Sequence, residues 1–273
     1  MFKKNLILII IAGTLFSLSA KKKKKKNQID NTPKDPALAK FAVYAKTAPK
    51  PQKTEPVDTS LPLKLEKGLR IMFIGNTLFE RAGEYGFFEA MLQTQYKDLN
   101  LKVRNFSWSA DEINLQPRPA NFASLEQHLT VWKADVLFAA FGFNESFKGP
   151  NGIPVFKQNL AKYLQNLKST AFNGKTGPKI VLVSPIANEN ISGINAADLN
   201  NQNIKLYRDA MAEVARQEKV GFANVFDATL KAMQEKGDMT YNGVHLKENG
   251  YQVFAEALFE ETFKTTAPQA SQN

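Results

Sequence analysis

The stretch from Leu69 to Leu78 constrains the fold more than any other part of the chain. Its unbroken apolar run, Ile71 to Ile74, is typical of a strand that is covered on both faces of a sheet. Gly75 can adopt the backbone angles of a sharp corner, and Asn76 and Thr77 can cap a following helix. That helix is expected to continue through apolar residues at helical spacing, namely Phe87, Met91 and Leu92. Ligands of parallel sheets bind where strands end and helices begin, so chemistry is expected at Thr77.

Strands and helices are predicted to alternate along the rest of the chain. Further apolar segments predict strands at residues 101–106, 135–141, 179–183 and 221–225. Apolar side chains recur at helical spacing in three stripes: Phe156, Leu160, Tyr163, Leu164 and Leu167; Ile204, Tyr207, Met211 and Val214; and Tyr251, Phe254, Ala255 and Leu258. This order predicts an α/β fold with a parallel five-stranded sheet and helices on both faces. The sequence contains no Walker loop and no Gly-x-Gly-x-x-Gly loop.

The net charge of +10 belongs to one end of the chain. Residues 1–67 hold 15 lysines and 5 acidic residues, whereas the remainder holds 21 basic and 21 acidic residues. A nucleic-acid-binding domain would carry a basic face of its own, so no nucleic-acid partner is expected. With no cysteine, the chain has no disulfide, no thiol nucleophile and no thiolate metal site. No metal site is predicted.

The amino-terminal end predicts export. Residues 1–20 have the layout of a signal peptide: two lysines, an apolar run and small residues. The lysines at 21–26 oppose transfer across a membrane, so an uncleaved membrane anchor is the alternative. Residues 21–66 are rich in lysine and proline and are predicted to be a flexible linker, whose lysines can contact anionic membrane or cell wall. The folded domain is then expected at 67–265, with a disordered tail at 266–273.

Two histidines are the candidates for a general base. His128 lies in a predicted helix and is best interpreted as a structural residue. His245 lies in a loop before the last helix, three residues after Asn242, which is a spacing that can pair a base with the residue that orients it.

Polar residues also follow the second and third predicted strands. Asn144 comes after Gly142 at the end of the third strand, where its amide can donate a hydrogen bond to an oxyanion. The segment from Asn105 to Asp111 ends the second strand, and its backbone amides can complete such a site.

Four of these segments, taken in order, resemble the blocks of the SGNH/GDSL hydrolase family. They are residues 73–77 (Gly-Asp-Ser in the family), 105–111, 142–145 (Gly-x-Asn-Asp in the family) and 242–245 (Asp-x-x-His in the family). The resemblance covers about residues 68–265. It implies a flavodoxin-like three-layer sandwich and hydrolysis of esters through a Ser-His-Asp triad without a cofactor.

The chain departs from the family pattern at the triad. Thr77 stands in place of the serine, and its methyl group restricts rotation. Asn242 stands in place of the aspartate and cannot stabilise an imidazolium by charge. The resemblance implies that Thr77 attacks, His245 is the base and Asn242 orients it, with Asn144 and the amides of Thr77 and Ala110 as the oxyanion hole. Ala110 here replaces the glycine of the second block.

Several other residues are expected to take part. Asn76 and Glu145 replace family aspartates, and with Arg118 they are expected to contact substrate, although a solvated Arg118 is the alternative. Asp238 can replace Asn242 as orienter if its loop folds back. Ser107, Ser109 and Ser146 lie in neighbouring loops and are the alternatives to Thr77 as nucleophile, whereas Ser184 is better interpreted as a strand-end cap.

The sequence therefore predicts an exported esterase or acylhydrolase that acts on an acyl ester of a small molecule, a carbohydrate or a lipid. The alternative is a catalytically impaired relative that binds a glycan or acyl ligand in the cell envelope. A third hypothesis is a structural envelope protein whose lysine-rich tail is the functional part.

Overall fold

The computed structural model describes residues 44–269. The predicted signal peptide, the lysine-rich residues 21–43 and the end of the predicted tail, residues 270–273, lie outside the described residues. No helix within residues 44–269 is long and apolar enough to cross a membrane.

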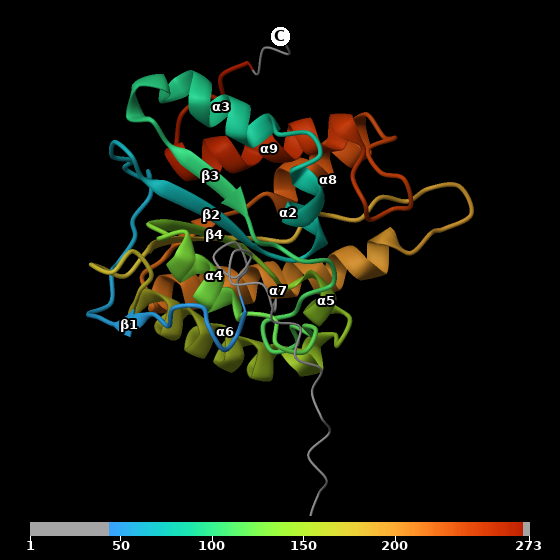
Figure 1. The fold of residues 1–273 in the computed structure, drawn as a ribbon. Helices are drawn as coiled ribbons and strands as arrows, with labels where there is room; N and C mark the ends of the chain where they lie inside the picture. Colours follow the sequence, from blue (N-terminus) through green and yellow to red (C-terminus); the bar gives the residue numbers. More distant parts are fainter. Residues whose placement is uncertain (1–43, 270–273) are drawn as a thin grey trace, which may run out of the picture.

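A parallel five-stranded sheet forms the centre of the molecule (Figure 1), with strand order β3-β2-β4-β6-β7. Its strands are β2 (Arg70–Gly75), β3 (Lys102–Asn105), β4 (Val136–Ala140), β6 (Lys179–Val183) and β7 (Gly221–Ala223). All five predicted strands are confirmed, with ends that differ by at most two residues. Buried apolar runs made β2, β4 and β6 visible in the sequence, whereas β3 at the edge of the sheet is largely exposed.

Helices cover both faces of this sheet, as predicted (Figure 1). On one face lie α3 (Phe87–Gln95), α8 (Phe226–Glu235) and α9 (Glu248–Phe263), and on the other lie α4 (Leu125–Val131), α6 (Ile153–Lys168) and α7 (Ala197–Gln217). The shorter elements are α2 (Thr77–Ala82), α5 (Phe143–Ser146), η1 (Lys97–Leu99) and η2 (Pro150–Gly152). The three-layer α/β sandwich is therefore confirmed.

The two faces of β2 supply two separate cores. Ile71 and Phe73 pack with the α3 and α9 side, whereas Met72 and Ile74 pack with the α6 and α7 side. Each of these side chains is at most 1% exposed. Successive side chains of a strand point to opposite faces of the sheet, which explains why these four residues divide between two cores. Gly75 is the last residue of β2 and lies at the carboxyl end of the strand.

The corner after β2 forms as predicted, but the helix that follows is shorter. Gly75 has φ 134°, and a Cβ atom there would lie 2.1 Å from the carbonyl oxygen of Ala140, so only glycine fits. Asn76 caps α2, because its Oδ1 accepts a hydrogen bond of 3.2 Å from the amide of Leu78. The prediction of one helix continuing to residue 92 is wrong: α2 ends at Ala82, and Gly86, with φ 64°, turns the chain before α3 begins.

Residues 44–66, here called the strap, are packed on the domain, so the prediction of a flexible linker is wrong for this part. In the strap, β1 (Gln52–Lys53) pairs in antiparallel fashion with β5 (Thr170–Ala171). Thr59 Oγ1 accepts a hydrogen bond of 2.8 Å from the amide of Ile180, and Leu63 is only 5% exposed. Leucines at 61, 63 and 65 alternate along the extended chain, which places them on one face against the core.

Candidate active site

A cavity of about 250 Å³ lies at the carboxyl ends of β2 and β4. Its polar lining comes from four segments that are far apart in the sequence and includes Thr77, Ala110, Asn144 and His245. Its apolar lining includes Leu78, Phe141, Phe143, Ile186, Leu246 and Tyr251. The structure therefore brings together the predicted hydroxyl, imidazole and amide groups at the edge of the sheet where ligands of parallel α/β proteins bind.

Thr77 is held by the loop that follows β3. As the first residue of α2, it presents Oγ1 to the backbone amide of Ala110, which donates a hydrogen bond of 3.2 Å. Ala110 has φ 63°, a left-handed conformation that costs a non-glycine residue about 1–2 kcal/mol. The alanine thus keeps a glycine-like backbone, and its amide points at the hydroxyl oxygen.

Asn242 contacts Nδ1 of His245 and is not itself among the residues that line the cavity. Its Oδ1 accepts hydrogen bonds from the amides of Val244 (3.2 Å) and His245 (2.9 Å), and its Nδ2 lies 2.9 Å from Nδ1 of the imidazole. The two backbone donors fix which end of the carboxamide is oxygen. Because Nδ2 can only donate, Nδ1 of His245 accepts, and the neutral ring carries its proton on Nε2.

Thr77 and His245 share the cavity, but no hydrogen bond joins the hydroxyl to the ring among the contacts of the described residues. Catalytic hydrogen bonds are often long until substrate binds, so proton transfer between Thr77 and His245 is compatible with the absence of this hydrogen bond. Burial lowers the pKa of His245; the charge of Arg81 lowers it further, and that of Glu80 opposes the shift. The ring is therefore neutral over a wider pH range than an ordinary histidine.

Asn144 lies in α5, directly after the turn at Gly142, which has φ 93°. Its Nδ2 is 3.4 Å from the carbonyl oxygen of Asp111, which connects it to the same loop as Ala110. Side-chain and backbone donors therefore reach the cavity from the ends of β3 and β4, the two strands that flank β2, as an oxyanion hole requires.

Glu145 does not line the cavity, in contrast to the predicted substrate contact. It is 5% exposed, and its two oxygens accept hydrogen bonds from the amides of Gly142 (2.9 Å) and Ile113 (3.0 Å). Burial raises the pKa of Glu145, and these backbone hydrogen bonds oppose the shift. The carboxyl group joins the end of β4 to the loop after β3, and thereby supports Asn144.

Arg118 is not among the residues that line the cavity, so the structure does not support its predicted contact with substrate. Its guanidinium makes two hydrogen bonds to Asp111, of 2.8 and 2.6 Å, and lies 4.5 Å from the ring of Trp108. The side chain is 17% exposed, so the alternative of a solvated arginine does not hold either. Asn76 lines the cavity, but its oxygen is engaged in capping α2.

The other candidate hydroxyls have structural partners or lie away from the cavity lining. Ser109 Oγ donates to Glu80 (2.9 Å), and Ser146 Oγ donates to the carbonyl oxygen of Phe143 (2.6 Å). Ser107 is half-buried and is not among the residues that line the cavity.

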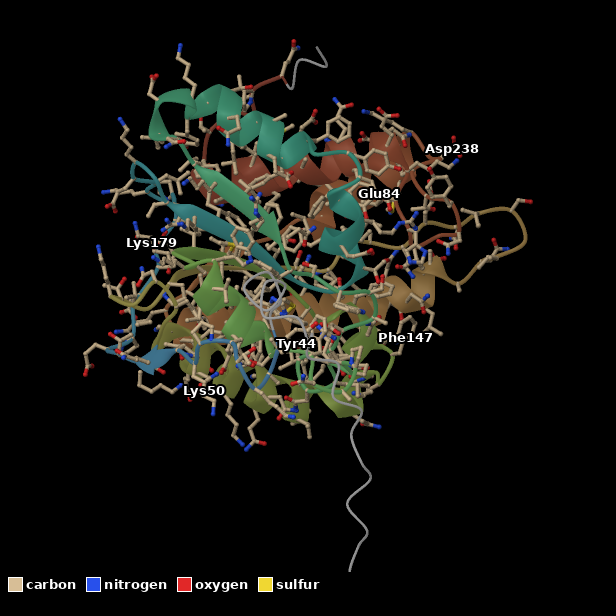
Figure 2. All side chains as sticks on the ribbon, viewed as in Figure 1. Tyr44, Lys50, Glu84, Phe147, Lys179 and Asp238 are labelled. Carbon is tan, nitrogen blue, oxygen red and sulfur yellow. The ribbon has the colours of Figure 1, made fainter. Side chains whose placement is uncertain are left out.

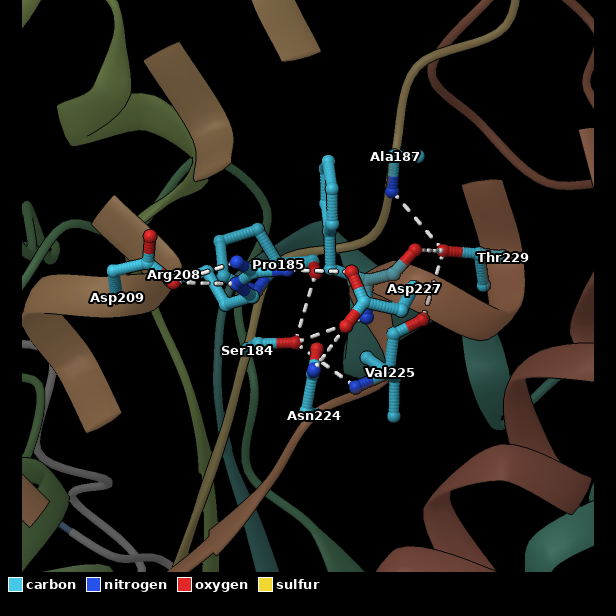
Figure 3. A network of polar contacts seen from close by, with 10 residues as sticks. Ser184, Pro185, Ala187, Arg208, Asp209, Asn224, Val225, Asp227 and Thr229 are labelled. Carbon is cyan, nitrogen blue, oxygen red and sulfur yellow. Dashed lines mark hydrogen bonds and ion pairs between the residues drawn. The ribbon is translucent and has the colours of Figure 1, made fainter. Parts of the chain in front are cut away.

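Ser184 has the capping role that the sequence predicts. Figure 3 shows its Oγ at the centre of a polar network at the start of α8, where it accepts hydrogen bonds from the amides of Val225 (3.0 Å) and Phe226 (3.2 Å). It also donates to the carbonyl oxygen of Pro185. The hydroxyl therefore secures the packing of α8 on the sheet.

Neither His128 nor Asp238 belongs to the site. His128 lies in α4, with ring centroids 5.8 Å from Phe106 and 5.3 Å from Phe122, as expected of a structural residue. Asp238 lies at the surface (Figure 2) and pairs with Lys247, so it does not orient His245.

Glu189, in the loop after β6, is a site-supporting residue that the sequence did not reveal. It is 6% exposed, and its carboxylate accepts hydrogen bonds from the amides of Met239 (3.0 Å) and Thr240 (2.8 Å) and from Thr240 Oγ1 (2.6 Å). Its own amide donates to the carbonyl oxygen of Gly243 (2.9 Å). The histidine-bearing loop is thus fixed by a carboxylate about fifty residues earlier in the chain, a separation that no local pattern signals.

The fold and the site define a three-layer α/β protein of the ester hydrolase class, with its polar groups gathered at the carboxyl edge of a parallel sheet. The chain belongs to the GDSL-like lipase/acylhydrolase family, whose model matches residues 73–253. The resemblance seen in the four sequence blocks is therefore confirmed, as is the expectation of a hydrolase acting on ester bonds. Among the described residues, no group of three or more histidine, aspartate or glutamate side chains is placed to hold a metal ion.

Solved structures support the same fold. An acetylxylan esterase from Geobacillus stearothermophilus is 16% identical, with a TM-score of 0.56 over 73% of this chain and 96% of that chain. A putative GDSL-like lipase from Parabacteroides merdae is 17% identical, with a TM-score of 0.58 over 73% of this chain and 97% of that chain. No curated protein matches the sequence of this chain.

Proposed function

We propose that this protein is an exported esterase that hydrolyses acyl esters with Thr77 as nucleophile and His245 as base. The observation that carries the proposal is the shared cavity, in which a hydroxyl, an imidazole and hydrogen-bond donors surround a space with apolar walls. Such a space suits the acyl part of an ester, because the free energy falls when apolar groups move out of water into an apolar environment.

In the proposed reaction, Thr77 Oγ1 attacks the ester carbonyl carbon while Nε2 of His245 takes the hydroxyl proton. The bond to the alcohol breaks as this proton passes to the leaving oxygen, and water then attacks the acyl-threonine in the same way to release the acid. Asn144 and the amides of Thr77 and Ala110 donate to the oxyanion, where one donor is typically worth about 3 kcal/mol.

The tautomer makes this reaction slow. Nε2 can accept a proton only when the ring proton is on Nδ1, and that form requires the carboxamide of Asn242 to turn over. We therefore expect a turnover well below that of a Ser-His-Asp enzyme.

Assays with short-chain nitrophenyl esters test the mechanism. Thr77→Ala and His245→Ala are expected to abolish hydrolysis, and Thr77→Ser is expected to retain it. Matched controls are Thr130→Ala, which removes a hydroxyl bonded within α4, and His128→Gln, which changes the other histidine. Hydrolysis that survives both Thr77→Ala and His245→Ala would exclude the mechanism.

The leader supports export, and the acetylxylan esterase among the structural neighbours supports an acylated carbohydrate as one substrate class. Fractionation of cells and sequencing of the mature amino terminus test export; an unprocessed chain held in the membrane would favour the anchor alternative. Deletion of residues 21–43 tests whether the lysines retain the protein on anionic membrane or cell wall. Equal retention of the deleted form would make this segment only a spacer.

A further inference from the structure

We propose that Asn242 is a site of self-modification, at which the folded chain converts this asparagine into the aspartate that the family pattern has in its place. The reaction is an intramolecular deamidation: the backbone nitrogen of Gly243 displaces ammonia from the carboxamide, and water then opens the resulting ring. The consequence for catalysis rests on the proposed function, but the conversion itself does not require turnover of an ester.

The local sequence makes deamidation possible at several places. An asparagine followed by glycine is especially open to this reaction, because glycine has no side chain to obstruct the approach of its nitrogen. The chain contains four such pairs, at residues 151–152, 173–174, 242–243 and 249–250. Since the four pairs share the same dipeptide, the surroundings of each pair in the folded structure decide which of them reacts.

The backbone amide of Gly243 has a path for the proton that it must lose. It donates a hydrogen bond of 2.9 Å to Thr240 Oγ1, and that hydroxyl donates one of 2.6 Å to Oε2 of Glu189. The carboxylate can therefore take the proton through the hydroxyl while the nitrogen attacks, which is general base catalysis by a relay. Glu189 is buried, so the relay is shielded from bulk water.

The side-chain carbonyl group of Asn242 is held for this attack. Its Oδ1 accepts the hydrogen bonds from the amides of Val244 (3.2 Å) and His245 (2.9 Å). These donors stabilise the negative charge that Oδ1 acquires when the nitrogen of Gly243 adds to Cγ, as the donors of an oxyanion hole do. Asn242 is exposed, so water reaches the carboxamide.

The atoms of the reaction balance with water as the co-reactant. The bond from Gly243 N to Asn242 Cγ forms, the bond from Cγ to Nδ2 breaks, and Nδ2 takes a proton from water and leaves as ammonia. The proton held by Glu189 returns to water, which restores the carboxylate. A second water then adds to Cγ of the succinimide, and the bond from Cγ to Gly243 N breaks. The backbone amide is thereby restored, and the net change is that asparagine and one water become aspartic acid and ammonia.

Aspartate is the expected product, and not isoaspartate. Isoaspartate would form if water attacked the main-chain carbonyl carbon of the ring. The amides of Val244 and His245 are directed at Oδ1, so they activate the side-chain carbonyl group for the second step as well as for the first.

The other three pairs lack the relay. The amides of Gly152 and Gly174 donate to backbone carbonyl oxygens, at 3.1 Å each, and a carbonyl group has no proton to pass on to a base. The amide of Gly250 donates to Oδ1 of Asn249, the oxygen of its own pair, at 2.9 Å.

Asn173 is the best internal control among these pairs. Its Oδ1 also accepts hydrogen bonds from two backbone amides, those of Lys175 (2.8 Å) and Thr176 (2.9 Å). Asn173 therefore has the oxyanion donors of Asn242 without the relay, and a comparison of the two asparagines isolates the effect of Thr240 and Glu189.

Peptide mapping by mass spectrometry tests the inference, on full-length protein incubated at neutral pH and sampled over time. Asn242 is expected to gain the mass of an NH2-to-OH exchange at least about tenfold faster than Asn173, because general base catalysis acts only at Asn242. A protease that cuts at aspartate but not at isoaspartate identifies the product. A rate at Asn242 no higher than that at Asn173, or isoaspartate as the main product, would overturn the proposal.

Variants of Thr240 test the relay. Thr240→Val is expected to slow the conversion of Asn242 at least about tenfold and to leave that of Asn173 unchanged, whereas Thr240→Ser keeps the hydroxyl and should retain the rate. In urea-unfolded protein, Thr240→Val should have no effect, since the relay exists only in the folded chain. An unchanged rate in folded Thr240→Val, or an equal slowing in urea, would overturn the relay.

Hydrolysis of a nitrophenyl ester by the same samples separates this inference from the proposed function. Conversion of Asn242 accompanied by a rise of kcat toward that of the Asn242→Asp variant supports both. Conversion without any hydrolysis supports this inference and removes the esterase mechanism. Hydrolysis by a chain in which Asn242 stays unconverted supports the esterase and overturns this inference.

Discussion

Replacement of Asn242 by aspartate is expected to speed hydrolysis, and the structure sets the size of the effect. The base-competent tautomer of His245 requires the carboxamide of Asn242 to turn over, which breaks the hydrogen bonds that its Oδ1 accepts from the amides of Val244 and His245. Two such hydrogen bonds are worth about 2 kcal/mol, or about a 30-fold reduction in the reactive form. An aspartate can accept from the backbone with one oxygen and from Nδ1–H with the other, so Asn242→Asp removes this barrier.

The aspartate also supplies a charge that stabilises the imidazolium formed during the reaction. In a serine protease triad, the opposite change from aspartate to asparagine lowers turnover by about 10⁴. We therefore expect Asn242→Asp to raise kcat by between about 30-fold and about 10⁴-fold.

Steady-state hydrolysis of a nitrophenyl ester measures the gain, with Asn249→Asp as the control for added charge. Circular dichroism of each variant checks that the fold is retained. A folded Asn242→Asp variant with unchanged or lower kcat would refute the reasoning, since neither the tautomer nor the missing charge would then limit the reaction.

Three further predictions concern the ring, its loop and the strap. Burial lowers the pKa of His245, and only the neutral ring acts as a base. We therefore expect kcat/KM to rise with pH and to level off, with a midpoint below about 6.5. A midpoint above this value would contradict the lowered pKa of His245. Glu189→Gln should lower kcat and destabilise the fold by about 2 kcal/mol, because it weakens the charge-assisted hydrogen bonds that hold the histidine loop. The control variant Asp135→Asn, at the opposite end of the sheet, should lower stability without lowering kcat. Equal kcat in the two variants would show that Glu189 does not position His245. Thr59→Val should lower the free energy of unfolding by about 1–3 kcal/mol in chemical denaturation, because it leaves a buried amide of β6 without its acceptor, and an unchanged midpoint would show that the strap contributes little.

The sheet and the cavity lining could be predicted because their signals are local. Buried strands appear as apolar runs, and the residues after them lie at one edge once the strands are parallel. For this reason Thr77, Asn144 and His245, from three separate loops, were expected near one another, and the structure places all three around one cavity.

Side-chain partners at long range could not be predicted in this way. Arg118 pairs with Asp111 and Asp238 pairs with Lys247, and nothing in the sequence distinguishes these pairs from solvated charges. Glu189 is the strongest case, because a buried carboxylate is rare and is only recognisable once its backbone donors are known.

The packing of the strap on the domain was not predicted, because the composition of the strap is that of a flexible linker. Proline and lysine, with four residues each, are the commonest residues in 44–66 and are typical of linkers. The leucines at 61, 63 and 65 recur at every second position, which is a weaker signal of the packing that the structure shows.

The strap also bears on how this protein should be produced in the laboratory. The family match begins at residue 73, and a recombinant chain started there would lack the partners of the β6 amide at Ile180 and of the carbonyl group of Thr262. It would also expose the core surface that Leu63 covers. A chain that begins before Tyr44 keeps these contacts. We expect it to be more stable and to aggregate less than a chain that begins at residue 73.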